Sequence, residues 1–153
     1  MIERRTVAAL AVSATALVAL LTSEGYSDRA YTPVPGDAPT IGFGTTEGVK
    51  LGDTITPPKA VARALTDVQK FEGAVKKCVT VPLSQNEYDA YLRLSYNIGA
   101  GAFCGSTLVK KLNSRDYRGA CEQILVWDKF KGKPLRGLTL RRQEEYQLCL
   151  KES

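Results

Sequence analysis

Histidine is absent from this 153-residue sequence. Its absence excludes three kinds of site: a Ser-His-Asp or Cys-His nucleophilic centre, a zinc site with histidine ligands, and a histidine general base. Any acid–base chemistry must therefore use carboxylates, tyrosine, lysine or cysteine.

Cysteine is scarce, and no two cysteines form a C-x-x-C pair. This spacing argues against zinc and against a thioredoxin-like redox site, and we expect neither a bound metal nor a cofactor. The cysteines form either two disulfides or four reduced thiols, depending on the compartment. They are Cys78, Cys104, Cys121 and Cys149.

Charge of either sign is moderate, and no long charged run occurs. Hydrophobic residues make up 44% and charged residues 24% of the chain, which indicates one compact globular domain. The net charge of +5 favours a polyanionic partner. Because the basic residues are scattered and no aromatic-rich basic strand occurs, we do not expect nucleic acid to be that partner.

Residues 6–23 contain no charge, proline or glycine and follow the basic pair Arg4 and Arg5. Eighteen residues is about the minimum for a membrane-crossing helix. Three interpretations compete: a buried core helix, a cleavable signal peptide, and an uncleaved membrane anchor. The last two both export the rest of the chain, and export favours disulfides over free thiols.

The composition of residues 6–23 predicts weak membrane insertion. Six Ala, four Leu and three Val are diluted by three Thr and two Ser. Each Leu or Val gains only about 0.3–0.6 kcal/mol on insertion, and the hydroxyl groups offset part of this gain. No charged residue marks a polar stripe, which disfavours the core helix. We therefore expect an uncleaved, weakly held signal-anchor helix at residues 1–23 and a globular domain at residues 24–153.

The exported part of the chain predicts an α+β fold with a small N-terminal β-lobe and a larger helical lobe. Short alternating runs and turns over residues 24–56 are typical of a twisted antiparallel sheet. Helices are expected over residues 57–77, after a capping box at Ser84–Glu87, after Asp116, and over residues 139–150. Residues 97–101 interrupt the second helical region, and residues 132–137 are expected to form a basic, flexible loop. A cleft is expected between the lobes.

Two carboxyl groups are candidates for acid–base work. Glu24 ends the apolar segment, where apolar surroundings favour its protonated form. Asp37 lies in a polar turn and is expected to stay ionised, and Thr40 adds a hydroxyl beside a strand. Such a pair suits glycosidic hydrolysis, in which one group protonates the leaving oxygen and the other activates water.

The residues around this pair resemble the active-site segment of the phage-type lysozymes, the endolysin muramidases of glycoside hydrolase family 24. The similarity covers residues 24–150 in four collinear stretches. They are Glu24-Gly25-Tyr26 with Ala30-Tyr31 and Thr40-Ile41-Gly42-Phe43-Gly44; Tyr96-Asn97-Ile98-Gly99-Ala100-Gly101 with Ser106-Thr107-Leu108; Gly119-Ala120-Cys121 with Trp127; and Gly137-Leu138-Thr139 with Arg141-Arg142 and Glu145.

The resemblance implies a lysozyme-like fold and hydrolysis of the bond between N-acetylmuramic acid and N-acetylglucosamine in peptidoglycan, usually with inversion. It implies that Glu24 is the general acid, that Asp37 orients or activates water, and that Thr40 helps to hold this water. It also implies the disulfides Cys121–Cys149 and, with it, Cys78–Cys104. The residues expected to line the sugar cleft are Tyr31, Asn97, Ser106 and Thr107. Arg141 and Arg142 are both expected to be structural and to brace a carboxylate such as Glu145.

Two positions depart from the family pattern. Many relatives carry an aspartate nine residues after the glutamate, where this chain has Pro33. Asp37 is therefore a shifted carboxylate, and Asp28 is its rival. Many relatives also carry histidine after Gly-x-Gly, where this chain has Thr45, which cannot transfer a proton in its place.

The apolar N-terminus makes the chain resemble the signal-anchor-release endolysins. These enzymes are exported as inactive precursors tethered to the host inner membrane and are later released into the periplasm. While residues 6–23 span the membrane, Glu24 would be held at the lipid surface, away from Asp37. We expect release to follow collapse of the membrane potential by a holin-type pore former, and we expect a monomer that lyses the host cell.

Two other functions fit the same residues. A lytic transglycosylase needs one acid–base glutamate and leaves anhydromuramic ends. A non-enzymatic, membrane-tethered peptidoglycan-binding protein needs no catalytic Glu24.

Overall fold

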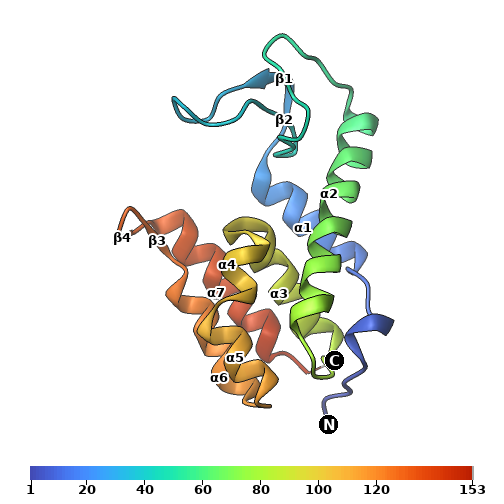
Figure 1. Cartoon of the computed structure of the whole chain (residues 1–153), viewed down its shortest axis with the longest axis vertical. Helices are drawn as coiled ribbons and strands as arrows, with labels where there is room; N and C mark the ends of the chain where they lie inside the picture. The colour runs from blue at the N-terminus through green and yellow to red at the C-terminus, as the bar shows by residue number, and fades with distance from the viewer. Residues whose placement is uncertain (153) are drawn as a thin grey trace. The chain divides into compact units, whose positions relative to one another are not determined.

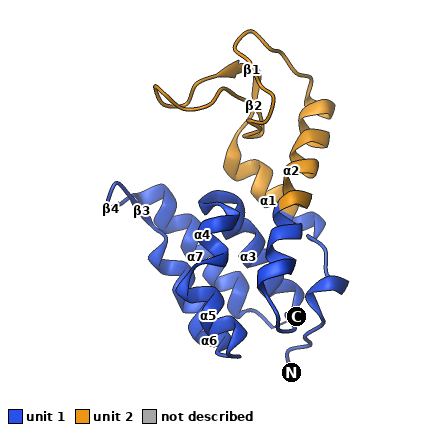
Figure 2. Cartoon of the chain, in the orientation of Figure 1, with its two compact units in different colours: residues 1–16, 71–153 blue, residues 17–70 orange. Residues whose placement is uncertain are grey.

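The computed structural model describes residues 1–152 and divides into two compact units. Unit 1 contains Met1–Ala16 and the chain from Phe71 onward, and unit 2 contains Leu17–Lys70 (Figure 2). Helices α1 (Ala14–Glu24) and α2 (Pro57–Cys78) each continue across the boundary between the units. The predicted α+β composition is confirmed, with the strands of the main hairpin in unit 2 and most helices in unit 1 (Figure 1).

Unit 2 is built on an antiparallel hairpin of β1 (Ser27–Tyr31) and β2 (Thr40–Gly42). Single bridges between Arg29 and Thr54 and between Ile41 and Thr45 extend this pairing. The small sheet predicted for residues 24–56 is therefore confirmed. The apolar core of the unit consists of Leu20, Ile41, Val49, Ala60, Ala64 and Val68.

Unit 1 is helical and is centred on α3 (Gln85–Ile98), which packs against α4 (Ala100–Cys104) and α7 (Arg136–Leu150). The predicted capping box is present, because the Ser84 hydroxyl accepts the Glu87 N–H and the Glu87 carboxylate accepts the Ser84 N–H. Helix α5 (Thr107–Asn113) and α6 (Tyr117–Gln123), which Asp116 caps as predicted, complete the unit with the 3₁₀ turn η2 (Ile124–Val126). The largest buried apolar side chains are Tyr88, Tyr91, Phe103, Leu83, Leu92, Leu94, Leu108, Leu112 and Ile124.

The prediction of a flexible loop at residues 132–137 was wrong. Strands β3 (Lys129–Phe130) and β4 (Lys133–Pro134) form a two-stranded hairpin there, and α7 begins at Arg136, earlier than predicted. Lys131 and Gly132 both have positive φ, 50° and 79°, which is the backbone of a tight two-residue hairpin turn. Gly132, which is compatible with a loop, lies in the turn of the hairpin, and Pro134 lies in β4.

The apolar segment 6–23 is not one continuous helix in this structure. It contains a short 3₁₀ turn, η1 (Val7–Ala9), and then α1, with extended residues between them. Ser13 explains the break, because its hydroxyl accepts the Ala16 N–H at 3.1 Å and so caps α1. Among residues 1–152, no helix combines the length and apolar character needed to cross a bilayer.

Buried carboxylates of unit 1 bind the same extended stretch. Glu72 accepts the Val12 N–H at 2.7 Å, and Asp89 accepts the N–H and the hydroxyl of Ser13 at 3.0 and 2.6 Å. Negative charge beside the first N–H groups of a helix is stabilising, since those groups lack partners within the helix. The sequence pattern could not indicate this, because both carboxylates lie about sixty residues or more further along the chain.

Both expected disulfides are present, Cys78–Cys104 and Cys121–Cys149, with Cα atoms 5.6 and 5.8 Å apart. The first joins the end of α2 to α4, and the second joins α6 to α7. The Tyr91 hydroxyl lies 3.4 Å from the Sγ atom of Cys149, inside the core of unit 1. Each bridge is expected to stabilise the fold by about 2–4 kcal/mol.

Candidate active site

Glu24 is the last residue of α1 and is partly buried. Gly25 follows with φ of 70°, a left-handed conformation that glycine adopts without strain. This residue ends the helix and leads the chain into β1. The Glu-Gly dipeptide therefore places a carboxyl group at the junction of helix and hairpin.

Gly44, the last residue of the Gly42-Phe43-Gly44 motif, lies beside this carboxyl group. A Cβ atom added to Gly44 would lie 3.3 Å from Oε2 of Glu24, so the carboxyl group lies on the side of Gly44 where any other residue would carry a side chain. Phe43 packs its ring on Tyr26, with centroids 5.2 Å apart. Gly42 serves packing instead, because a Cβ atom there would lie 3.1 Å from Cβ of Ala60 on α2. The sequence motif contains Gly44, but its position beside Glu24 could not be predicted from the motif.

Thr40 and Tyr31 lie opposite each other in the hairpin, as paired residues of β2 and β1. Thr40 is buried, and its hydroxyl donates to the Ala38 carbonyl at 3.3 Å. Tyr31 is 44% exposed, which leaves its ring accessible to a ligand. The hairpin thus brings together two of the predicted site residues.

Asp37 and Asp28 are both exposed carboxylates of unit 2. Asp37 ends a tight turn in which its N–H donates to the Val34 carbonyl at 2.9 Å, with Gly36 at φ of 92°. Asp28 lies within β1, and its carbonyl accepts the Ile55 N–H. Both carboxylates are accessible to a ligand, and both are candidates for the second catalytic carboxylate.

Thr45 occupies the position after Gly-x-Gly at which many relatives carry histidine, and it has a structural role. Its side chain is buried, and its hydroxyl donates to Oδ2 of Asp67 on α2 at 2.7 Å. Its backbone exchanges two hydrogen bonds with Ile41. Thr45 therefore ties the turn after β2 to α2.

The remaining predicted ligand-contacting residues belong to unit 1. Ser106 caps α5: its hydroxyl accepts the Val109 N–H and donates to the Phe103 carbonyl. Thr107, the next residue, is exposed. Asn97 is exposed near the end of α3, and its side-chain oxygen accepts a hydrogen bond from Nη1 of Arg142 at 2.8 Å.

Of the two arginines predicted to brace a carboxylate such as Glu145, Arg142 is buried, contacts Asn97 and is paired with Glu145. The Nη2 atom donates to Oε1 of Glu145 at 2.9 Å, and Nε lies 2.8 Å from Oε2 in an ion-pair contact without hydrogen-bond geometry. The side chains are 1% and 3% exposed. Burial raises the pKa of Glu145 to about 7 and lowers the pKa of Arg142. The pair positions Asn97 through the hydrogen bond from Arg142. Because both side chains are charged, the sequence alone would place them on the surface.

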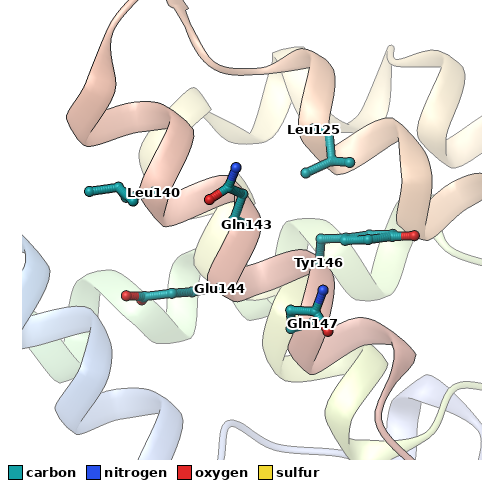
Figure 3. A pocket seen from close by; sticks show the side chains of 6 residues that line it. All are labelled: Leu125, Leu140, Gln143, Glu144, Tyr146 and Gln147. Atoms are coloured by element: carbon teal, nitrogen blue, oxygen red, sulfur yellow. The ribbon is translucent and has the colours of Figure 1, made fainter.

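A hollow on the surface of unit 1 involves none of the predicted site residues. Figure 3 shows Leu125 of η2 facing side chains from successive turns of α7. Its lining consists of Leu125, Leu140, Gln143, Glu144, Tyr146 and Gln147. Among residues 1–152, no group of three or more potential ligands is arranged to hold a metal ion.

Comparison with known proteins identifies relatives along nearly the whole chain. The family model described as phage lysozyme matches residues 22–145. The chain is 41% identical over 141 residues to an endolysin of Acyrthosiphon pisum secondary endosymbiont phage 1, covering 90% of this chain and 96% of that protein. It is 37% identical over 150 residues to a SAR-endolysin of Pseudomonas phage phiKMV, covering 95% and 91%.

A solved structure shares the fold. The muramidase domain of SpmX from Asticaccaulis excentricus superposes with a TM-score of 0.85 at 28% identity, covering 92% of this chain and 98% of that one. The fold is therefore lysozyme-like, and the match includes Glu24, the hairpin and Arg142 within one family segment. The chain belongs to the phage lysozyme family and is a glycoside hydrolase.

Proposed function

We propose that this protein is an endolysin that hydrolyses the β-1,4 bond between N-acetylmuramic acid and N-acetylglucosamine in bacterial peptidoglycan. The observation that carries the proposal is the position of the Glu24 carboxyl group, at the end of α1 and beside Gly44, which follows β2 of the hairpin. A carboxyl group placed in this way is suited to protonate a leaving glycosidic oxygen.

The other roles follow from this assignment. Asp37, with Asp28 as the alternative, activates the hydrolytic water, and Thr40 helps to hold it. Inversion requires the two carboxyl groups to stand about 6.5–9.5 Å apart to admit that water. Contacts to the glycan come from Tyr31, Asn97, Ser106 and Thr107.

Product analysis of purified murein tests the reaction. A muramidase adds water and leaves reducing N-acetylmuramic acid ends, whereas a lytic transglycosylase forms 1,6-anhydromuramic ends. We expect mass spectrometry of the released muropeptides to show only reducing ends. Anhydro products would assign the chain to the transglycosylases, and binding without any products would support a non-enzymatic murein-binding protein.

Replacing Gly44 by Ala tests the position of the Glu24 carboxyl group. The new Cβ atom would lie 3.3 Å from Oε2, so the carboxyl group must shift by a few tenths of an ångström; because misplacement of a catalytic group by about 1 Å can cost 100-fold in rate, we expect murein hydrolysis to fall severalfold. Gly48→Ala is the matched control, because Gly48 also has positive φ, 70° against 87°, yet nothing lies within 4 Å of its added Cβ atom. Both variants should lose about 1–2 kcal/mol of stability from left-handed strain. Equal activities would show that Gly44 does not position the acid.

We also propose that residues 6–23 form a signal anchor in the exported precursor, so that residues 1–23 and 24–153 are separate functional parts. The anchor tethers an inactive form to the periplasmic face of the host inner membrane, and a holin-type pore former triggers release into the periplasm. The similarity to a SAR-endolysin supports this course.

Contacts of the N-terminus in the folded chain support a coupling between release and folding. Arg4 pairs with buried Glu87 at 2.7 Å and stacks on the Tyr117 ring, and Arg5 exchanges two backbone hydrogen bonds with Leu83. In a tethered precursor, both arginines stay on the cytoplasmic side while Glu87 and Leu83 are outside. Tethering and these contacts therefore exclude each other. The folded contacts, together with the hydrogen bonds of Val12 and Ser13, stabilise the released form.

The rate of murein hydrolysis by protein embedded in lipid vesicles tests whether membrane tethering inhibits the enzyme. We expect the embedded form to digest added murein at least about tenfold more slowly than the lipid-free form, since Glu24 is then held at the lipid surface away from its position beside Gly44. The intact mass of the released protein should retain residues 1–23. Equal rates would contradict regulation by tethering, and loss of about the first nineteen residues would indicate a conventional signal peptide.

A further inference from the structure

The hairpin of β3 and β4 and the residues that flank it form a basic and apolar surface of unit 1, here called the basic hairpin surface and defined as residues 126–140. From Lys129 to Leu140 the chain carries no carboxylate. Its cations are Lys129, Lys131, Lys133 and Arg136, all exposed. The one acidic residue of the surface, Asp128, lies beside Nζ of Lys129 and the Thr139 hydroxyl, each at 3.3 Å.

Large apolar side chains stand among these cations. Val126, Phe130, Leu135 and Leu140 are each 50–55% exposed. Figure 1 shows the hairpin at the edge of unit 1, beyond the ends of its helices. Two-residue strands are too short to be stable alone, so the hairpin is held by its base, where the Leu135 N–H donates to the Asp128 carbonyl at 3.0 Å.

The surface continues onto α7. Arg136 and Leu140 are one helical turn apart and therefore share a face. Leu140 also lines the hollow of Figure 3, so the basic hairpin surface adjoins that hollow. The acidic residue one turn further along, Glu144, is paired with Arg93 at 3.2 Å.

We propose that the basic hairpin surface binds the headgroup region of a bilayer rich in anionic phospholipid. The cations are complementary to lipid phosphates, and the aromatic and aliphatic side chains among them are of the kind that enters the interface between headgroups and acyl chains. Murein is also anionic, but its sugars and peptides offer no apolar layer for Phe130 and Leu135. This binding is separate from hydrolysis, because none of the proposed catalytic residues belongs to the surface.

Vesicle co-sedimentation of the full, lipid-free chain tests the proposal. We expect binding to vesicles of phosphatidylglycerol and phosphatidylethanolamine and at least about 25-fold weaker binding for Lys131→Glu/Lys133→Glu, since each basic group near an anionic surface contributes about fivefold. Lys77→Glu/Lys110→Glu is the matched control, because it changes the net charge equally at exposed positions of unit 1 outside the surface. Phe130→Ser, which leaves the charge unchanged, should also weaken binding.

A reporter in the hairpin separates this contact from attachment through residues 6–23. The chain has one tryptophan, Trp127, so Trp127→Phe/Phe130→Trp moves the only indole to the hairpin. We expect a blue shift and quenching by brominated phosphatidylglycerol, and neither with phosphatidylcholine alone. The proposal is overturned if the indole is not quenched, if both charge reversals weaken binding equally, or if Lys131→Glu/Lys133→Glu weakens binding to purified murein instead of to vesicles.

Discussion

Glu24→Gln is expected to lower the rate of murein hydrolysis about 100- to 10,000-fold while leaving the fold intact. Glutamine has the same shape but cannot donate a proton to the leaving oxygen, so only general acid catalysis is removed. The contact with Gly44 should survive, because the amide occupies the volume of the carboxyl group. The measurement is the initial rate of clearing of purified murein, with thermal unfolding to confirm that the variant is folded.

Glu47→Gln is the matched control for this experiment. Glu47 is an exposed glutamate of the same unit that pairs with Lys70 at the surface, and its replacement should change the rate by less than about twofold. If Glu24→Gln kept more than half of the activity, another residue would be the acid. If neither variant nor the natural chain released muropeptides, the tethered binding-protein alternative would be favoured.

Arg142→Ala is expected to destabilise the protein by about 3–5 kcal/mol, the largest stability effect of a single substitution that we predict. The guanidinium is 1% exposed and contacts both Glu145 and Asn97. Its removal leaves a buried carboxyl group without a counter-charge and an amide oxygen without its donor. The free energy of unfolding in urea measures the loss. Arg118→Ala, which removes an exposed pair with Glu122, should cost less than about 1 kcal/mol.

The pH dependence of the free energy of unfolding tests whether the effect of Arg142→Ala arises from the buried carboxyl group of Glu145. Burial raises the pKa of Glu145 from 4.5 to about 7, so the folded state holds this proton more tightly than the unfolded state. Its stabilising contribution is complete below pH 4.5 and is lost as the pH rises toward 7, a change of about 3 kcal/mol. Glu145→Gln should abolish this dependence. The loss caused by Arg142→Ala should be smaller at pH 5 than at pH 8, because Glu145 is then neutral; an equal loss at both pH values would contradict the assignment.

Local elements were predictable where a side chain acts on its own backbone neighbours. The capping box at Ser84, the cap at Asp116, and the helix that follows Thr56 all depend on residues within one turn. The final helix and the basic hairpin were less predictable. Gly132 and Pro134 are compatible with either a loop or a turn. The structure shows a hairpin because Lys131 has a positive φ and β3 pairs with β4.

The candidate site residues were proposed from pattern and resemblance, but their contacts could not be predicted. Glu24 and Thr40 were selected by pattern and resemblance, whereas the role of Gly44 depends on how closely the hairpin approaches the end of α1. Pairing of Arg142 with Glu145 followed from helical spacing, but its burial and its hydrogen bond to Asn97 did not.

The sequence by itself determined the resemblance to the phage lysozymes and the local framework, because the order of the motifs and the positions of the helix-capping residues are properties of the chain in any conformation. Only the tertiary structure showed that residues 6–23 form a 3₁₀ turn and a separate helix in the folded chain, and not one continuous helix. Those residues are apolar enough to predict a single helix, yet Glu72 and Asp89 bind their backbone and Arg4 pairs with Glu87. Such contacts join positions some sixty to eighty residues apart, and their energy exists only once the chain has folded.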